Sequence, residues 1–133
     1  MLKPQTAPIY RRTYMPQTTR LQSLPASQME PSNLTAIENF TTGDKTELIH
    51  TAYSTPDGST FTGVWECAPS RVKIDAYPVH EMMTVISGSV TVTNDGESPQ
   101  IFNAGDTFMI PKGTKCVWEI TKKLKKYFMI TAS

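Results

Sequence analysis

Two side chains in this 133-residue chain stand out as candidates for chemistry, the carboxylate of Glu81 and the thiol of Cys116. A thiol attacks as its thiolate, so Cys116 would need a base within reach and a lowered pKa. Glu81 is the candidate base, although a carboxylate activates a thiol poorly. Glu81 could also act as a general acid or base if burial raised its pKa. The residue types therefore indicate two catalytic candidates but no particular reaction.

The two histidines, His50 and His80, show no ligand spacing. His80 directly precedes Glu81, so on an extended strand the two side chains point to opposite faces. Only a bulge around Pro78 would turn His80 inward. We interpret both histidines as surface or packing residues.

Composition narrows the class of protein. Apolar residues make up 38% of the chain and charged residues 19%, and the net charge is +1, which gives no reason to expect a nucleic-acid or membrane partner. No apolar run is long enough for a membrane span, and prolines interrupt the N-terminus where a signal peptide needs an apolar stretch. We expect a cytoplasmic protein in which Cys67 and Cys116 are both thiols.

The chain divides into an arm and a β domain. Residues 1–45 are rich in Pro, Thr and Gln and lack a sustained hydrophobic period, which predicts an N-terminal arm without its own core. Its segment "YRRTYMPQTTR" mixes Arg with Tyr, as nucleic-acid arms do, but a solvated or packed tail is the better interpretation. Residues 46–133 alternate short β-prone runs with turn signals. We expect about nine short strands there, at 47–53, 61–67, 71–77, 81–87, 89–93, 100–102, 107–110, 115–120 and 126–131.

Two glycine-containing segments frame the middle of this β domain, "YPVHEMMTVISG" and "GDTFMIPKG". Gly88 is expected to let the chain turn sharply between paired strands. Pro111 and Gly113 predict a turn between antiparallel strands. The lysine-rich run "TKKLKK" at 121–126 could attract an anion, but it is more typical of an edge strand guarded against aggregation.

With both segments in this order, the chain resembles the cupins, and most of all the subgroup named after the cupin domain of (S)-ureidoglycine aminohydrolase. The resemblance covers roughly residues 60–131. The shared features are "VWECAPS" with Trp65, "YPVHE" with Tyr77 and Glu81, Ser87–Gly88, "AGD" at 104–106, "PKGTKCVW" with Trp118, and "KKYF". The resemblance implies an all-β fold, a single double-stranded β-helix (cupin/jelly-roll) barrel with an N-terminal arm.

The same resemblance bears on the metal. Metal-binding cupins carry a His-x-His pair, a glutamate four residues later and a further histidine in the second segment. Here Asp75, Tyr77 and Cys116 occupy the three histidine positions, and only Glu81 is retained. Because first-row metals at such sites favour imidazole ligands, we expect no metal and no cofactor. Zinc held by Asp75, Glu81 and Cys116 is the alternative.

The resemblance also implies a ligand pocket inside the barrel. The face that metal cupins turn inward would carry Arg71, Lys73, Asp75, Tyr77 and Glu81, with Cys116 and Trp118 from a facing strand and Trp65 closing one side. Aromatic walls with a few charged groups suit a small polar or sugar-like molecule. The alternative is that Lys73 and Asp75 pair on an exposed strand end while the aromatic residues form core.

Three functions stay open at this point. The first is metal-free binding of a small molecule, the second is an enzyme acting on a small nitrogenous or sugar-derived metabolite, and the third is a structural scaffold for dimerisation. An outward-facing row of Val72, Ile74 and Ala76 on "RVKIDAY" would need cover, so we expect a homodimer.

Overall fold

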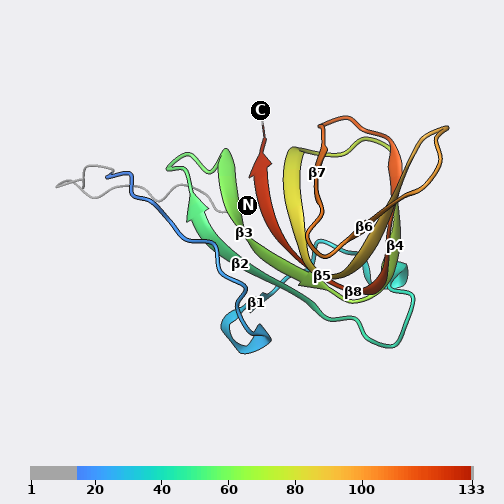
Figure 1. Cartoon of the computed structure of the whole chain (residues 1–133), viewed down its shortest axis with the longest axis horizontal. Helices are drawn as coiled ribbons and strands as arrows, with labels where there is room; N and C mark the ends of the chain where they lie inside the picture. Colours follow the sequence, from blue (N-terminus) through green and yellow to red (C-terminus); the bar gives the residue numbers. More distant parts are fainter. Residues whose placement is uncertain (1–14, 133) are drawn as a thin grey trace.

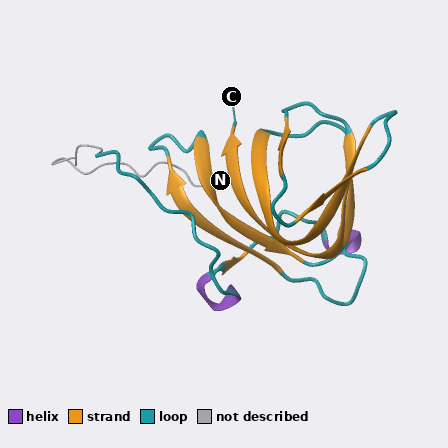
Figure 2. Cartoon of the chain, viewed as in Figure 1, coloured by secondary structure: helices purple, strands orange, loops and turns teal. Residues whose placement is uncertain are grey.

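The computed structural model describes residues 15–132, and within that range the chain is a β protein with two short 3-10 helices (Figures 1 and 2). The strands are β1 (Glu30–Pro31), β2 (Glu47–Ser54), β3 (Thr60–Cys67), β4 (Ser70–Ile74), β5 (His80–Asn94), β6 (Gln100–Asn103), β7 (Thr107–Ile110) and β8 (Cys116–Thr131). The helices are η1 (Ala26–Gln28) and η2 (Ile37–Asn39). No helix in the described residues is long and apolar enough to cross a membrane. The start of the expected arm, 1–14, lies outside the described residues.

Two long strands, β5 and β8, organise the fold by pairing antiparallel along most of their length (Figure 1). Both bend near their middle, where the register shifts between Val85 and Val90. Gly88 stands at this bend with φ +79°, and a Cβ there would lie 1.9 Å from the carbonyl oxygen of Lys123. The expectation of a turn at Gly88 was therefore wrong, because this glycine bends one continuous strand around a close backbone contact.

The bend divides the sheet into two facing halves, as a jelly-roll barrel requires. One half extends the β1–β2–β3 sheet, and it contains the second half of β8, the first half of β5 and all of β7. In the other half, the second half of β5 pairs with β6, and the first half of β8 pairs with β4. The predicted all-β cupin fold is confirmed. The run 121–126 belongs to β8, which has neighbours on both sides, so its interpretation as a guarded edge strand was wrong.

The space between the two halves is filled by alternate side chains of the strands. On β8, Leu124 and Phe128 point inward, and Trp118 and Ile120 do so from the opposing half. The buried cluster is completed by Trp65, Cys67, Tyr77, Met83, Val85, Val90, Val92, Ile110 and Cys116. The candidate site lies within this core.

Strand β4 has the opposite orientation to the one expected from its sequence. Val72 and Ile74 pack against the core, whereas Arg71 and Lys73 are exposed. Apolar side chains gain most from burial, and an unpaired charge is costly to bury, so the strand turns its apolar row inward. Of the row given as the reason for a homodimer, Val72 and Ile74 are covered and only Ala76 is exposed, so that reason is wrong, while the homodimer itself stays a prediction.

The described part of the arm is attached to the barrel at several points. Strand β1 pairs with β2, and Met29 beside it is buried. Further back, the Lys125 ammonium donates a hydrogen bond to the carbonyl oxygen of Leu24. A hollow of about 250 Å³ lies between Thr19–Leu24 and the outer side of β2 and β3. This part of the arm therefore lies against the outside of the sheet, whereas Phe40, near the end of the arm, packs against the buried cluster.

Candidate functional site

A buried ion pair lies inside the barrel. The Lys126 ammonium, from β8, is 2.8 Å from Oε2 of Glu81, from β5. Their side chains are only 5% and 7% exposed. Taking two charges out of water is costly, and their attraction offsets that cost only when the remaining donors and acceptors also find partners. The surroundings of the pair therefore decide whether it is stable.

Tyr77 provides the second contact to the carboxylate. Its hydroxyl donates a hydrogen bond of 2.6 Å to Oε1 of Glu81, so both carboxylate oxygens have a partner. Burial, together with the negative charge of Glu81, raises the pKa of Tyr77 well above its usual range. Tyr77 is therefore a protonated donor at every physiological pH.

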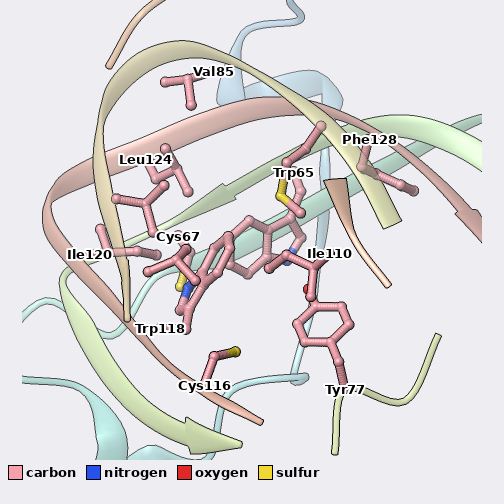
Figure 3. Packing of buried hydrophobic residues seen from close by; sticks show 13 residues of the cluster. Trp65, Cys67, Tyr77, Val85, Ile110, Cys116, Trp118, Ile120, Leu124 and Phe128 are labelled. Atoms are coloured by element: carbon pink, nitrogen blue, oxygen red, sulfur yellow. The ribbon is translucent and has the colours of Figure 1, made fainter. Parts of the chain in front are cut away.

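Two tryptophans enclose the ammonium. Lys126 Nζ lies 4.7 Å from the ring centroid of Trp65 and 4.6 Å from that of Trp118. The two rings meet edge to face with 6.4 Å between centroids, and Figure 3 shows them at the centre of the buried cluster. Met83 Sδ lies 3.2 Å from the same nitrogen. Cation–π attraction to two ring faces compensates part of the hydration that the ammonium loses.

A second buried carboxylate, Glu47 on β2, holds one of these tryptophans in place. Trp65 Nε1 donates to Glu47 Oε2 at 3.0 Å. Oε2 also accepts hydrogen bonds from the Ser32 hydroxyl and the Leu34 amide, and Oε1 accepts one from the Thr35 amide. Burial opposes the ionisation of Glu47, but these hydrogen bonds outweigh it and hold its pKa below the usual value. Glu47 thus connects residues 32–35 to a wall of the interior.

The two thiols are buried and poorly suited to nucleophilic attack. Cys116 is 3% exposed, and Figure 3 places it on the same side of the tryptophan pair as Tyr77. Burial raises the pKa of Cys116, and it raises that of Cys67 to about 11. A catalytic cysteine needs the opposite shift. Both thiols therefore behave as small apolar groups of the core.

Several predicted pocket residues lie elsewhere. Arg71, Lys73 and Asp75 are exposed, so placing them in the interior was wrong. Strand β4 ends at Ile74, and the bend that follows changes the alternation, so that Tyr77 points inward although Arg71 and Lys73 do not. The interior brings together Tyr77, Glu81, Cys116, Trp65 and Trp118. Whether these five residues bind a ligand stays a prediction.

The histidines do not reach the interior. His80 Nδ1 accepts a hydrogen bond of 3.0 Å from the Lys112 amide at the turn after β7, and the ring is part-exposed. His50 lines the outer hollow beneath the arm.

The residues at the family's metal positions do not fit a metal ion. Both oxygens of Glu81 already bind donors, and one of these donors, the Lys126 ammonium, is itself a cation. Asp75 is exposed while Cys116 is buried, so the alternative zinc ligand set does not assemble. Within residues 15–132, no three His, Cys, Asp or Glu side chains are grouped closely enough to hold an ion. The positive charge that the structure does place beside Glu81 is the ammonium of Lys126.

Sequence reasoning missed Lys126 and Glu47. The signal for Lys126 was its spacing from Leu124, Phe128 and Ile130, which puts a lysine in a row of inward residues. Glu47 gave no comparable signal, because its partners come from an arm segment without a recognisable pattern.

Solved structures share this fold at low sequence identity. A protein of unknown function from Pseudomonas syringae pv. tomato, assigned to the DUF861 family, aligns with a TM-score of 0.73 and 22% identity over 84% of this chain; the chain spans 46% of that protein's length. A putative ethanolamine utilization protein Q from Salmonella typhimurium aligns over 91% of this chain and 98% of its own, with a TM-score of 0.61 and 16% identity. The EutQ protein of Clostridium difficile aligns over 76% of this chain and 81% of its own, with a TM-score of 0.56 and 15% identity. At these identities the likeness concerns the fold.

The family assignment comes from the sequence itself. None of the curated proteins matches the chain. The finer resemblance to the ureidoglycine aminohydrolase subgroup stays a prediction. The EutQ-like cupin domain matches residues 54–128, which is more than half of the chain and includes the ion pair of Glu81 and Lys126, so this protein belongs to the EutQ-like cupin domain family.

Proposed function

We propose that this cupin binds a small polar or sugar-like molecule in its barrel without a metal, and that Lys126 and Glu81 recognise it. The observation that carries the proposal is a buried ion pair, 2.8 Å long, whose ammonium lies against the rings of two tryptophans. Replacing such a pair by apolar side chains of similar volume is often neutral or stabilising. A need for core packing alone therefore does not account for it.

The chemistry of the pair indicates what a ligand must offer. Lys126 donates only and the ionised Glu81 accepts only, so a molecule that separates them needs an acceptor for the first and a donor for the second. A polyhydroxylated molecule offers both on adjacent carbons. Its C–H face can lie against Trp65 or Trp118, as apolar surface does against aromatic rings.

The interior is closed in the described form, so binding requires rearrangement. Two hollows, of about 220 and 250 Å³, lie on the outer side of the sheet, and neither is lined by Glu81, Lys126 or Tyr77. A ligand would enter by displacing the Tyr77 hydroxyl and separating the ion pair. We expect slow association for that reason, since entry waits for an opening of the core.

The test combines binding with paired variants. Mass spectrometry of the protein purified under native conditions, followed by calorimetric titration with monosaccharides, sugar acids and amino acids, should reveal one class that binds the wild type. Glu81→Leu combined with Lys126→Met should fold, because both charges are removed together, and should lose binding. Lys122→Met, on an exposed position of the same strand, is the matched control and should bind normally. Undiminished binding by the double variant would refute the proposal.

A scaffold role is the second candidate, favoured by the closed interior. If no compound of any class binds and the double variant is at least as stable and assembles as the wild type does, the barrel serves as a rigid body. The ureidoglycine-aminohydrolase-like enzyme has less support, because burial raises the pKa of Cys116 and both oxygens of Glu81 are engaged.

A further inference from the structure

The ammonium of Lys126 has few polar neighbours besides Glu81. Its side chain is 5% exposed, and Oε2 of Glu81, at 2.8 Å, is its one oxygen acceptor among residues 15–132. Its other neighbours are Sδ of Met83 at 3.2 Å, which is a weak acceptor, and two tryptophan rings. Lysines in apolar surroundings of this kind are the ones that enzymes use as nucleophiles toward carbonyl groups.

The presence of a lysine rather than an arginine at this position adds to the argument. A guanidinium binds both oxygens of a carboxylate through its planar fork, and it keeps its proton, so it does not act as a nucleophile. Here the ammonium of Lys126 binds one oxygen of Glu81, and the Tyr77 hydroxyl binds the other. A proton acceptor is therefore held by a second hydrogen bond at 2.8 Å from an amine nitrogen. Charge neutralisation alone does not need this arrangement, whereas acid–base chemistry at an amine does.

We propose that Lys126 forms an imine with a small aldehyde, such as the open-chain form of a sugar, inside the barrel. The inference rests on the proposed function, because the interior must open to the ligand in the same way. First, one proton of the ammonium passes to Oε2 of Glu81, and the freed nitrogen attacks the carbonyl carbon. The C–N bond forms while the C=O double bond opens, and a second proton moves from the nitrogen to the carbonyl oxygen.

Loss of water completes the reaction. The carboxyl group of Glu81 returns its proton to the hydroxyl of the intermediate, the C–O bond breaks, and water leaves. The product is a protonated imine on Lys126 beside an ionised Glu81, so the site carries the same charges before and after the reaction. The groups that stabilise the ammonium, a carboxylate and two ring faces, therefore also stabilise the product.

The test is reductive trapping of the full-length chain with glycolaldehyde, the smallest hydroxyaldehyde, followed by sodium borohydride and peptide mapping by mass spectrometry. Borohydride reduces an imine to a stable secondary amine on the lysine that formed it. We expect the label on Lys126 to exceed that on the exposed Lys122 by on the order of tenfold or more, because Glu81 assists proton transfer at Lys126.

Two variants sharpen the test, with circular dichroism to check that each retains the fold. Glu81→Gln keeps a hydrogen-bonding side chain but removes the proton acceptor, so it should slow the labelling of Lys126 on the order of tenfold or more. Faster labelling in this variant would show that the carboxylate restrains the amine, which overturns the acid–base role. Lys122→Met, at an exposed position of the same strand, is the matched control and should leave the labelling of Lys126 unchanged.

The results distinguish a failure of this inference from a failure of the proposed function. If Lys126 is labelled no more than Lys122, the imine is refuted. If calorimetric titration then still finds a bound sugar or polyol, the proposed function stands without the imine. If Lys126 is unlabelled and no compound binds, both proposals are overturned.

Discussion

Two buried glutamates in the same barrel have different kinds of hydrogen-bonding partner. Glu47 accepts hydrogen bonds from uncharged donors, namely a hydroxyl, two backbone amides and an indole. Glu81 instead binds an ammonium and a phenol. Their exposed fractions, 5% and 6%, are nearly equal. Burial is therefore the same for both, and only the type of partner differs.

The difference in partners suggests a structural role for Glu47 and a ligand-binding role for Glu81. Two of the four donors to Glu47 are backbone amides, which cannot rotate away from the carboxylate. Together with the indole of Trp65, they attach the segment 32–35 to this tryptophan through Glu47. A lysine side chain has several rotatable bonds, so the Lys126–Glu81 contact can open without unfolding a strand. We infer that Glu47 is structural and that Glu81 is the group available to a ligand.

The largest effect is expected from Lys126→Met. This change leaves the Glu81 carboxyl group buried with only Tyr77 as a partner, and it should lower the free energy of unfolding by about 3–5 kcal/mol. Urea unfolding followed by tryptophan fluorescence measures the loss. Adding Glu81→Leu should restore most of it, because that buried carboxyl group is then gone. A double variant as unstable as the single one would contradict this account of the pair.

Glu47→Gln should have the next largest effect, about 2–3 kcal/mol. The amide keeps one acceptor oxygen but turns its NH₂ group toward donors, so at least one buried donor loses its partner. Trp65 should also become more mobile, which can be followed by the anisotropy of its fluorescence in a Trp118→Phe background. An unchanged stability would mean that residues 32–35 are not held through Glu47.

Tyr77→Phe should cost less, about 1–2 kcal/mol, because it removes one hydrogen bond to a charged group while the ion pair remains. If the interior opens to admit a ligand, this variant should also bind it faster. Stopped-flow fluorescence with a ligand found by titration measures that rate. Slower association would show that the hydroxyl guides the ligand instead of blocking it.

A smaller effect should appear in the pH dependence of stability. The folded pKa of Glu47 lies below the usual 4.5, so its contribution is complete above pH 4.5 and is lost as the pH falls through the lower folded value. Asp44, whose pKa is lowered to about 2 by hydrogen bonds from Thr46, adds to the same slope. The difference between wild type and Glu47→Gln isolates Glu47, and it should shrink below pH 4.5. A constant difference would show that the carboxylate's charge is not involved.

Much of the fold could be predicted from residue patterns. The turn residues at 111–113 and the short β runs gave the all-β barrel, because such signals are local. The number of strands could not be predicted. The segments 81–87 and 89–93 form one strand around Gly88, 115–120 and 126–131 form another, and β1 was not expected. What keeps the strand around Gly88 continuous is a close approach to Lys123, a contact between residues distant in sequence.

The site could be predicted only in part. Tyr77 and Glu81 could be predicted from the motif. For β4, alternation alone allows either face to point inward, and the burial of Val72 and Ile74 decides between the two faces. Lys126 was hidden in a run of lysines, three of which, Lys122, Lys123 and Lys125, have solvent or the arm as their neighbour. Its spacing from Leu124, Phe128 and Ile130 identifies it as the inward lysine once the path of β8 through the barrel is known.

We infer that the Lys126 ammonium supplies the positive charge beside Glu81 in place of a metal ion. The direct measurement is the elemental content of wild-type protein purified without chelators, read together with Glu81→Ala and Cys116→Ala. We predict far less than one zinc, iron, manganese or copper per chain in the wild type, and no change in either variant. About one metal ion per chain in the wild type, lost in Glu81→Ala, would contradict the claim.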